Sequence, residues 1–110
     1  MNKIILAGRI VNDIEIKKSK SEKEYTTFTV AVKRKLDKDK TDFIDCVAFG
    51  NLVQPLSKYV GKGNRIIVEG ELNINDFENK EGQKQRGFTV VVKDFYFVDF
   101  KENIQTEITE

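Results

Sequence analysis

The sequence predicts an all-β fold with one short helix, arranged as a small five-stranded Greek-key barrel. Three observations predict it. Apolar and polar side chains alternate with a period of two through most of the 110 residues, which is typical of strands with one buried face. Only one segment, 51–60, has helical spacing. This helix falls after the third of five predicted strands, and the two strands that follow it are long.

The first two predicted strands differ in pattern. Residues 2–10 are mostly apolar, and the first strand is expected to continue at 14–16, after Asp13. Residues 17–23 are polar and predict a turn. Residues 25–34 alternate cleanly between apolar and polar side chains, which predicts a second strand that buries one face.

The third strand and the helix follow a charged connection at 35–41. The strand is expected at 42–49 and the helix at 51–60. Asn51 is expected to cap the helix, and Pro55 has to lie in the first turn, where its missing N–H costs little. A glycine shortly after the helix ends it.

Two long strands complete the chain, at 65–77 and 88–100, with a hairpin loop at 78–87. We expect one domain at 1–100 and a short, polar, disordered C-terminal tail at 101–110. Five strands with a helix between the third and the fourth is the order of the oligonucleotide-binding (OB) fold, a partly open Greek-key barrel. Other small barrels remain compatible with this order.

The composition argues against several classes of protein. A single cysteine, Cys46, cannot form an intrachain disulfide, which indicates a reducing compartment, and its apolar neighbours favour a core thiol. No apolar stretch reaches the roughly 18 residues of a membrane span. Without histidine or a Gly-rich phosphate loop, neither an enzyme nor a cofactor is expected. Asp37, Asp39 and Asp42 lack the glycine and the distal glutamate of a calcium loop, so no metal is expected either.

Charge is distributed unevenly although the net charge is only +1. Residues 1–93 hold 18 Lys and Arg against 13 Asp and Glu, and residues 94–110 hold one against five, so the two parts carry +5 and −4. Residues 17–40 alone carry nine basic and four acidic side chains. A basic body with an acidic end is typical of a nucleic-acid binder, and equally of a charge-rich solvated surface.

Three phenylalanines fall on polar strand faces. Between 43 and 49 the even positions are all apolar and predict the buried face, which leaves Phe43 and Phe49 beside Asp45. Phe77 likewise shares its face with Glu and Asn side chains. Exposing such a ring forgoes roughly 1.5–3 kcal/mol of burial, and stacking of nucleic-acid bases, worth about 1–3 kcal/mol each, would account for it. A β-bulge that reverses the parity and an oligomer interface that covers the rings are the alternatives.

Basic side chains near these rings are candidate phosphate contacts. One group ends the second strand beside the third, and another lies in the loop beyond Phe77; the two groups are Lys33, Arg34 and Lys35, and Lys80, Lys84 and Arg86. A third group flanks the helix without such rings and is better interpreted as solvated surface: Lys58, Lys62 and Arg65.

Six segments in order resemble the bacterial and phage single-stranded DNA-binding protein (SSB) family, over about residues 1–100; they are 2–9, 28–32, 42–50, 58–63, 68–72 and 77–83. The resemblance implies sequence-independent binding and protection of single-stranded DNA in replication, recombination or repair. It implies base stacking on Phe43, Phe49 and Phe77, the rings that strand parity selects. Where the family has a fourth aromatic this chain has Leu36, which implies a weaker stacking position.

The resemblance also implies a homo-oligomer, with a tetramer favoured over a dimer and the first strand at an interface. The expected location is the cytoplasm of a bacterial cell or a phage-infected host. Cellular members end in an acidic, phenylalanine-tipped tail that recruits other proteins. The sequence stops at Ile108-Thr109-Glu110 without this tip, as a phage, plasmid or secondary copy or a shortened chain would. Two rival interpretations stay open: an aromatic face that docks a protein, and a preference for RNA.

Overall fold

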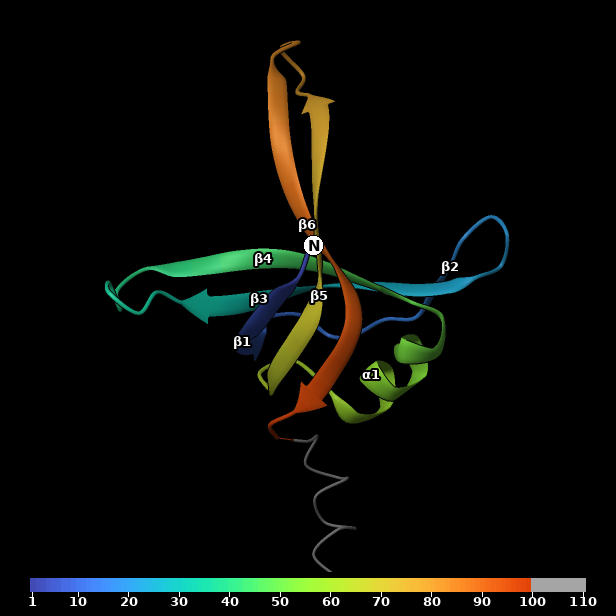
Figure 1. The fold of residues 1–110 in the computed structure, drawn as a ribbon. Coiled ribbons are helices and arrows are strands. Elements are labelled where there is room, and N and C mark those ends of the chain that lie inside the picture. The colour runs from blue at the N-terminus through green and yellow to red at the C-terminus, as the bar shows by residue number, and fades with distance from the viewer. Residues whose placement is uncertain (100–110) are drawn as a thin grey trace, which may run out of the picture.

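Six strands curve into one sheet that closes almost into a barrel in the computed structural model (Figure 1). The structure describes residues 1–99, so the tail expected at 101–110 lies outside the described residues. The sheet order is β1-β5-β6-β4-β3-β2, with a further pairing of β1 and β3. The elements in chain order are β1 (Ile4–Ile10), β2 (Lys17–Lys18), β3 (Glu24–Lys33), β4 (Thr41–Phe49), α1 (Val53–Tyr59), β5 (Arg65–Glu78) and β6 (Lys84–Phe97).

Two short pairings close the sheet into a ring. β1 pairs with β5 from Ile4 to Arg9, and its last two residues, Arg9 and Ile10, pair with β3. The other closure is parallel and joins β4 to β6, with Val47 opposite Val91. The predicted fold is therefore confirmed: five long strands form an OB-type barrel, with the helix between the third and the fourth. β2 adds a sixth strand of two residues.

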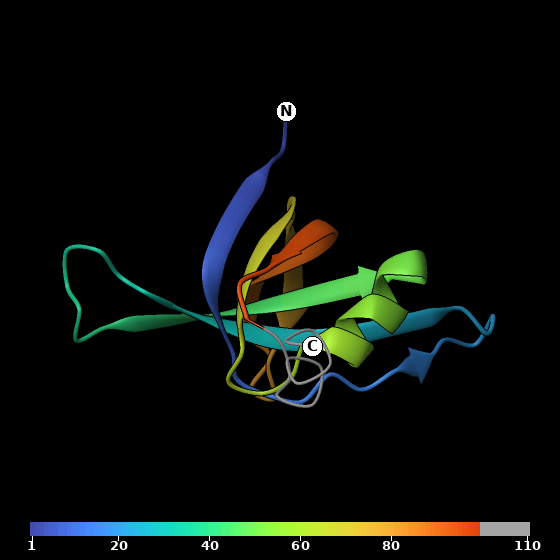
Figure 2. The same ribbon diagram turned by 90° about the horizontal axis from the view of Figure 1, so that it is seen from below.

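The core fills the inside of this ring. The even-numbered positions of β3 and β4 point inward, as the alternation predicts, with Phe28 and Val30 on one strand and Cys46 and Ala48 on the other all buried. α1 lies below β3 and β4 in Figure 1 and buries Leu56 against them. Seen from below (Figure 2), the β3–β4 hairpin projects from one side of the barrel and the β2–β3 turn from the other.

Gly8 permits the closure between β1 and β3. A Cβ atom at this position would overlap the backbone carbonyl oxygen of Ala31. The two backbones approach so closely here that only a residue without a side chain fits. The glycine near the end of an otherwise apolar strand therefore has a structural reason.

The first strand is shorter than expected, because residues 14–16 form no strand. After Ile10, two hydrogen bonds hold the chain to β3. The N–H of Val11 donates to the carbonyl oxygen of Thr29, and the N–H of Thr29 donates to the side-chain oxygen of Asn12. Residues 14–16 then pair with no strand of the described chain, although Ile14 packs against the core. The short β2 pairs with β3 instead, inside the segment expected as a turn.

The helix starts differently from the prediction. A single 3-10 turn at Gly50–Leu52 precedes α1, and no side chain caps either element, so the expected role of Asn51 was wrong. Pro55 does lie in the first turn of α1. Within the described part of the chain, no helix is long and apolar enough to cross a membrane.

The hairpin between β5 and β6 is longer than expected, and its loop is only 79–83 rather than 78–87. The hairpin stands out from the barrel as an arm (Figure 1). Beyond Leu72 almost every side chain of the arm is exposed, so the apolar alternation that marks a strand is lost there. The side-chain oxygen of Asn79 closes the loop by accepting hydrogen bonds from the backbone N–H groups of Glu81 and Gln83.

Candidate nucleic-acid interface

The three predicted rings are exposed on the outer side of the sheet. Phe43 is 66% exposed, Phe49 53% and Phe77 52%. One register shift interrupts the β5–β6 pairing, next to Glu69, and the extra residue is Lys93 on β6. β4 and β5 therefore keep their alternation, and the alternative of a bulge that reverses the parity of the rings is excluded.

The outer side is continuous from the arm to β4. Phe77 pairs with Gln85 on β6, and further along the same side of β6 Val91 pairs with Val47 of β4. Phe43 and Phe49 are six residues apart on β4, which corresponds to roughly 20 Å along a strand. The three rings are thus separate contact points on one surface and cannot share a base.

Phe49 lies at the end of β4 beside another aromatic. Its ring centroid is 6.3 Å from that of Tyr25, with a tilt of 34° between the planes. The shallow depression around Phe49 includes Lys23 and Glu24, and Glu24 accepts a hydrogen bond from Gln54 at 3.2 Å. One basic and one acidic side chain leave this ring in a neutral environment.

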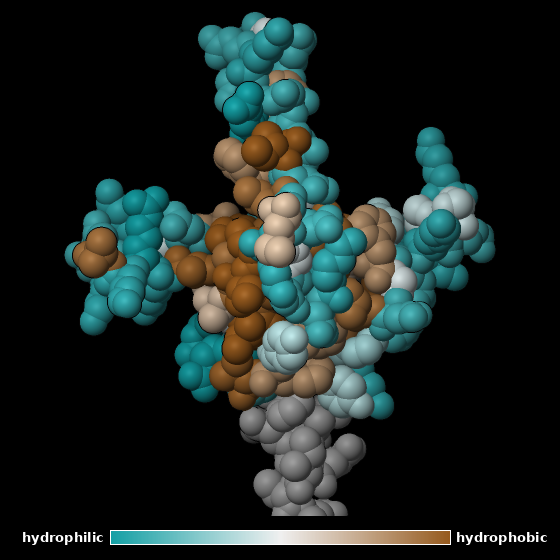
Figure 3. Space-filling view, in the orientation of Figure 1, coloured by the Kyte–Doolittle hydropathy of each residue, from teal (hydrophilic) through white to brown (hydrophobic). Residues whose placement is uncertain are grey.

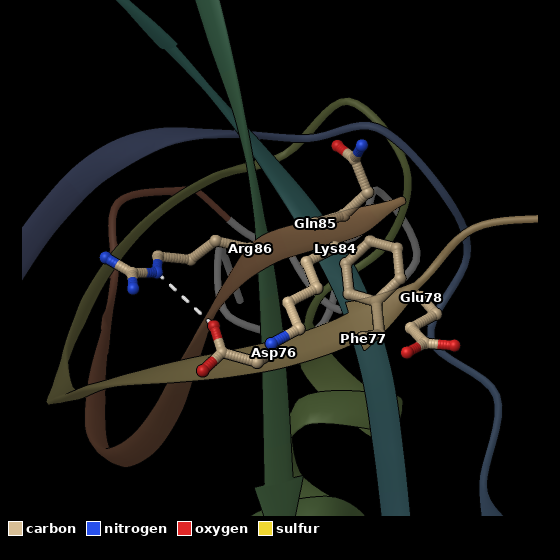
Figure 4. Close-up of a pocket in the computed structure, with 6 residues that line it drawn as sticks. All are labelled: Asp76, Phe77, Glu78, Lys84, Gln85 and Arg86. Carbon is tan, nitrogen blue, oxygen red and sulfur yellow. Dashed lines mark hydrogen bonds and ion pairs between the residues drawn. The ribbon is translucent and has the colours of Figure 1, made fainter. Parts of the chain in front are cut away.

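Phe77 lies near the tip of the arm (Figure 4). Phe77 and Gln85 rise from one side of the hairpin, while Lys84 and Asp76 lie towards the other. These residues line one depression together with Glu78 and Arg86. The structure thus brings the predicted cations Lys84 and Arg86 near the predicted ring, but the same depression holds two carboxylates, and Arg86 Nε is 3.3 Å from the Asp76 carboxylate.

Phe88 is a further exposed ring on the arm that the sequence interpretation did not select. It is 54% exposed and pairs with Ile74, which is exposed to the same extent. Its even number places it on the opposite side of β6 from Gln85, and so opposite Phe77. Strand parity would not have found it, because Phe88 shares its face of β6 with the buried Val90 and Val92; the ring is exposed because the arm extends beyond the barrel (Figure 1).

Phe43 lies on the rim of a groove that has a different electrostatic character. Three cations line the groove with it, Arg9, Lys33 and Arg65, and no acidic side chain does. Lys33 was predicted, whereas Arg9 and Arg65 were not. They come from the end of β1 and the start of β5 and face each other in the strand register. No spacing in the sequence predicts this pairing, because it arises from closure of the barrel.

The other predicted residues line none of the three depressions that contain the rings. Arg34 donates from Nε and Nη2 to Asp42 at 3.1 and 3.0 Å, which lowers the pKa of Asp42 and partly neutralises the guanidinium. Lys35 and Leu36 lie in the loop between β3 and β4, where Leu36 is 99% exposed. Lys80 lies in the loop at the tip of the arm.

Catalytic and metal chemistry have no obvious place among residues 1–99. No three side chains of the metal-ligating types come together in that range. The thiol of Cys46 is buried, and burial, followed by the charge of Asp45, raises its pKa to about 12, far from the values of a reactive thiolate. The outer surface with its rings and cations remains as the candidate site.

The sequence comparisons point to one family. A model of the family described as "Single-strand binding protein family" matches residues 1–98. The chain is 36% identical over 100 residues to the single-stranded DNA-binding protein of Clostridium perfringens, a match that covers 90% of this chain and 67% of that protein. It is 39% identical over 106 residues to the corresponding protein of Thermotoga maritima, with 91% and 75% covered.

Two solved structures have the same architecture. The mitochondrial single-stranded DNA-binding protein Rim1 of S. cerevisiae superposes with a TM-score of 0.76 at 23% identity, and covers 88% of this chain and 94% of its own. A Plasmodium falciparum SSB in complex with single-stranded DNA superposes with a TM-score of 0.75 at 26% identity, with 90% and 96% covered. Both likenesses agree with the barrel described above.

Proposed function

The chain belongs to the single-strand binding protein family, so it is a non-enzymatic protein that binds single-stranded DNA in replication and repair, and we propose that it does so by stacking bases on Phe43, Phe49 and Phe77. Aromatic faces accept every base, so the binding is independent of sequence.

One observation carries this proposal. Three large rings are each more than half exposed on one continuous outer side of the sheet, where Phe43 lies opposite Ala31, Phe77 opposite Gln85 and Phe49 opposite Tyr25. Burial of each ring would have been favourable by roughly 1.5–3 kcal/mol. A ligand with flat apolar faces recovers that free energy, and unpaired bases have such faces.

Cationic side chains supply the second part of the mechanism by contacting phosphates. Lys33 is the best placed, because it lines the groove beside Phe43. Lys84 and Arg86 line the depression beside Phe77. Arg34, Lys35 and Lys80 are weaker candidates, since one is paired with Asp42 and two lie in loops. Leu36 offers an apolar contact without a ring.

Fluorescence anisotropy of a labelled oligo-dT tests the proposal. The double substitution Phe43→Ala/Phe77→Ala is expected to weaken binding by about 2 kcal/mol or more, at about 1–3 kcal/mol per lost stacking contact. The matched control is Phe88→Ala, which removes an equally exposed ring from the opposite side of the same arm and is expected to leave the affinity nearly unchanged. An equal loss in both variants would contradict the assignment of the outer side.

Two further ligands separate the rival interpretations. Matched duplex DNA offers phosphates without exposed bases, so equal affinity for duplex and single strand would overturn the stacking mechanism. Matched RNA tests whether a 2′-hydroxyl is read. Normal DNA affinity in the Phe43→Ala/Phe77→Ala variant would instead assign the aromatic side to a protein partner.

The protein is also proposed to form a homo-oligomer, with a tetramer favoured over a dimer. In the described residues, β1 pairs with β3 only at its last two positions, so the second edge of Ile4–Gly8 has no strand beside it. Ile5, Tyr96 and Val98 are exposed. Figure 3 shows hydrophobic surface gathered where Figure 1 draws β1 and β5. An open apolar edge of this kind favours pairing with a second copy.

A further inference from the structure

Resting on the proposed function, we infer that Asn2 is a positioning residue of the stacking site. Its side chain fixes the direction in which the arm leaves the barrel, and so holds Phe77 on the same DNA path as the rings of β4. Asn2 acts through the arm and does not itself need to contact DNA.

The Asn2 side chain makes two hydrogen bonds to one residue of β5. Its Nδ2 donates to the carbonyl oxygen of Leu72 at 2.8 Å, and its Oδ1 accepts from the N–H of Leu72 at 2.9 Å. A carboxamide presents a donor and an acceptor side by side, as a peptide group does. The side chain therefore acts as a strand partner for Leu72, beyond the last backbone pair of β1 and β5, which joins Ile4 to Gly70.

These two bonds lie at the foot of the arm (Figure 1). Leu72 is the last residue of β5 that is not exposed, and it packs against the core. Across the hairpin it is opposite Val90 of β6, and Val90 in turn is paired with Cys46 of β4. Both strands of the hairpin are therefore held from outside at the same level, one by β4 and the other by Asn2.

Beyond this level the arm is a two-stranded ribbon. Residues 73–78 of β5 pair with 84–89 of β6, and every residue of 73–78 is exposed. A two-stranded hairpin has little stability of its own, and no buried side chain of β5 beyond Leu72 fixes its angle to the barrel. The direction of the arm therefore depends on the contacts at its foot.

Phe77 is sensitive to this direction because it lies far along the arm. Five residues separate it from Leu72, which corresponds to roughly 17 Å along a strand. Over that distance, a change of about 10° at the foot moves the ring by about 3 Å. This is about the 3.4 Å rise per nucleotide of a DNA strand, so the ring would no longer meet the same base. Phe43 and Phe49 lie on β4 and are not part of this lever.

The role of Asn2 is compatible with assembly through β1. The bonds to Leu72 lie on the side of the first strand that faces β5. The open edge of Ile4–Gly8, which is proposed to face a second copy, lies on the opposite side. Asn2 can therefore hold the arm in the homo-oligomer as well, because nothing in this role requires its side chain to be accessible.

A double-mutant cycle, measured by anisotropy with labelled oligo-dT on the full chain, tests the inference. Asn2→Leu keeps the size of the side chain but offers neither donor nor acceptor. It is expected to lower the affinity about threefold or more, as part of the cost of a lost stacking contact. In a Phe77→Ala background the same substitution is expected to change the affinity by less than about twofold. In a Phe43→Ala background the full loss is expected to remain.

Asn64→Leu is the matched control. Asn64 Oδ1 accepts from the N–H of Gly61 at 2.8 Å, beside the opposite end of β5, so its loss is expected to show no coupling to Phe77. Asn2→Gln keeps the carboxamide and is expected to lose less affinity than Asn2→Leu. Hydrogen exchange gives an independent measurement: in Asn2→Leu the amide of Leu72 is expected to exchange faster, while the amides of β3 keep their protection.

Failure of this inference can be told apart from failure of the proposed function. If Phe77→Ala weakens binding but Asn2→Leu costs the same with and without the ring, Asn2 acts on the whole barrel and the inference is wrong. An unchanged affinity in Asn2→Leu would also overturn it, and a changed molar mass in sedimentation velocity would assign Asn2 to assembly instead. If Phe77→Ala itself leaves the affinity unchanged, the stacking proposal fails at that ring, and the role of Asn2 fails with it.

Discussion

At the scale of single residues, chemically identical side chains differ in exposure and in their surroundings according to their place in the fold. Phe28 and Phe43 have the same side chain, yet one is in the core and the other is 66% exposed, because they occupy opposite parities of paired strands. Arg34 and Arg65 both have a carboxylate partner, but only Arg65 lines the groove beside Phe43. The position in the fold, not the residue type, decides which of them lies on the exposed surface beside a ring.

At the residue scale, Cys46 lowers the free energy of unfolding as the pH rises into the alkaline range. The thiol is neutral when protonated, and burial raises its pKa from 9.0 to about 12. Above pH 9 the unfolded chain loses the proton while the folded chain keeps it, so stability is present below pH 9 and is lost as pH rises towards 12. We expect a loss of roughly 1 kcal/mol between pH 7.5 and pH 10, since one pKa unit corresponds to about 1.4 kcal/mol.

Urea unfolding at the two pH values measures this loss. Cys46→Ala removes the titrating group and is the control, although it lowers stability at both pH values by leaving a cavity. Tyr96, whose pKa is raised first by Asp94 and then by Glu69, titrates in the same direction in both proteins and cancels in the difference. An identical pH dependence of the two proteins would show that Cys46 has no part in it.

At the scale of elements, the arm and the closure of the barrel have different physical origins. The arm is held by backbone pairing from Asn73 to Glu78 and by a turn around Asn79, with few buried side chains. The junction of β1 with β3 depends on direct contact of two backbones at Gly8. We therefore expect substitutions at the closure to affect the whole fold, and substitutions at the arm tip to act locally.

Gly8→Ala tests this difference. The added Cβ would overlap a backbone oxygen, so the strands must separate, and we expect a loss of about 1–3 kcal/mol or more in the free energy of unfolding. Gly82→Ala at the arm tip meets no neighbouring atom but has a φ of +79°, which costs about 1–2 kcal/mol. Because that strain is confined to the turn, oligo-dT binding at Phe43 should survive Gly82→Ala. A fully stable Gly8→Ala protein would contradict the contact.

At the scale of the whole molecule, the distribution of exposed apolar and charged surface separates two roles. The outer side from the arm to β4 carries well-separated exposed rings, whereas β1 and its surroundings carry an apolar band and an open strand edge. Isolated rings suit successive bases, and a continuous apolar edge suits a second copy. Lys3 and Glu69, 2.6 Å apart, join β1 to β5 across this surface.

Ile5→Glu tests assembly through β1. The substitution places a charge on the exposed edge strand, and we expect the homo-oligomer to fall to a smaller species, since burial of an unpaired carboxylate is strongly unfavourable. Sedimentation equilibrium gives the molar mass of both proteins. Ile74→Glu, at a comparably exposed isoleucine of the arm, is the matched control and should leave the mass unchanged. An unchanged mass in Ile5→Glu would remove β1 from the interface.

Much of the fold was predictable because the barrel keeps a strict alternation wherever one face of a strand is buried. The alternation in β4 located both the core side, with Cys46, and the exposed side, with Phe43. Prediction failed where the pattern does not separate strand from loop: Lys84 begins β6 at the exposed tip of the arm, and the alternation Ile14-Glu15-Ile16 is typical of a strand although these residues form none. It also failed at Asn51, because a 3-10 turn replaced the cap.

The sequence by itself determined the order of strands, the face of each long strand and the exposure of Phe43, Phe49 and Phe77, because these depend on local alternation. The tertiary structure alone decided which cations accompany which ring. Arg9 and Arg65 are 56 positions apart, and only closure of the barrel makes them neighbours. Pairing between distant strands depends on the summed packing of the whole core, and no local pattern in the chain records it.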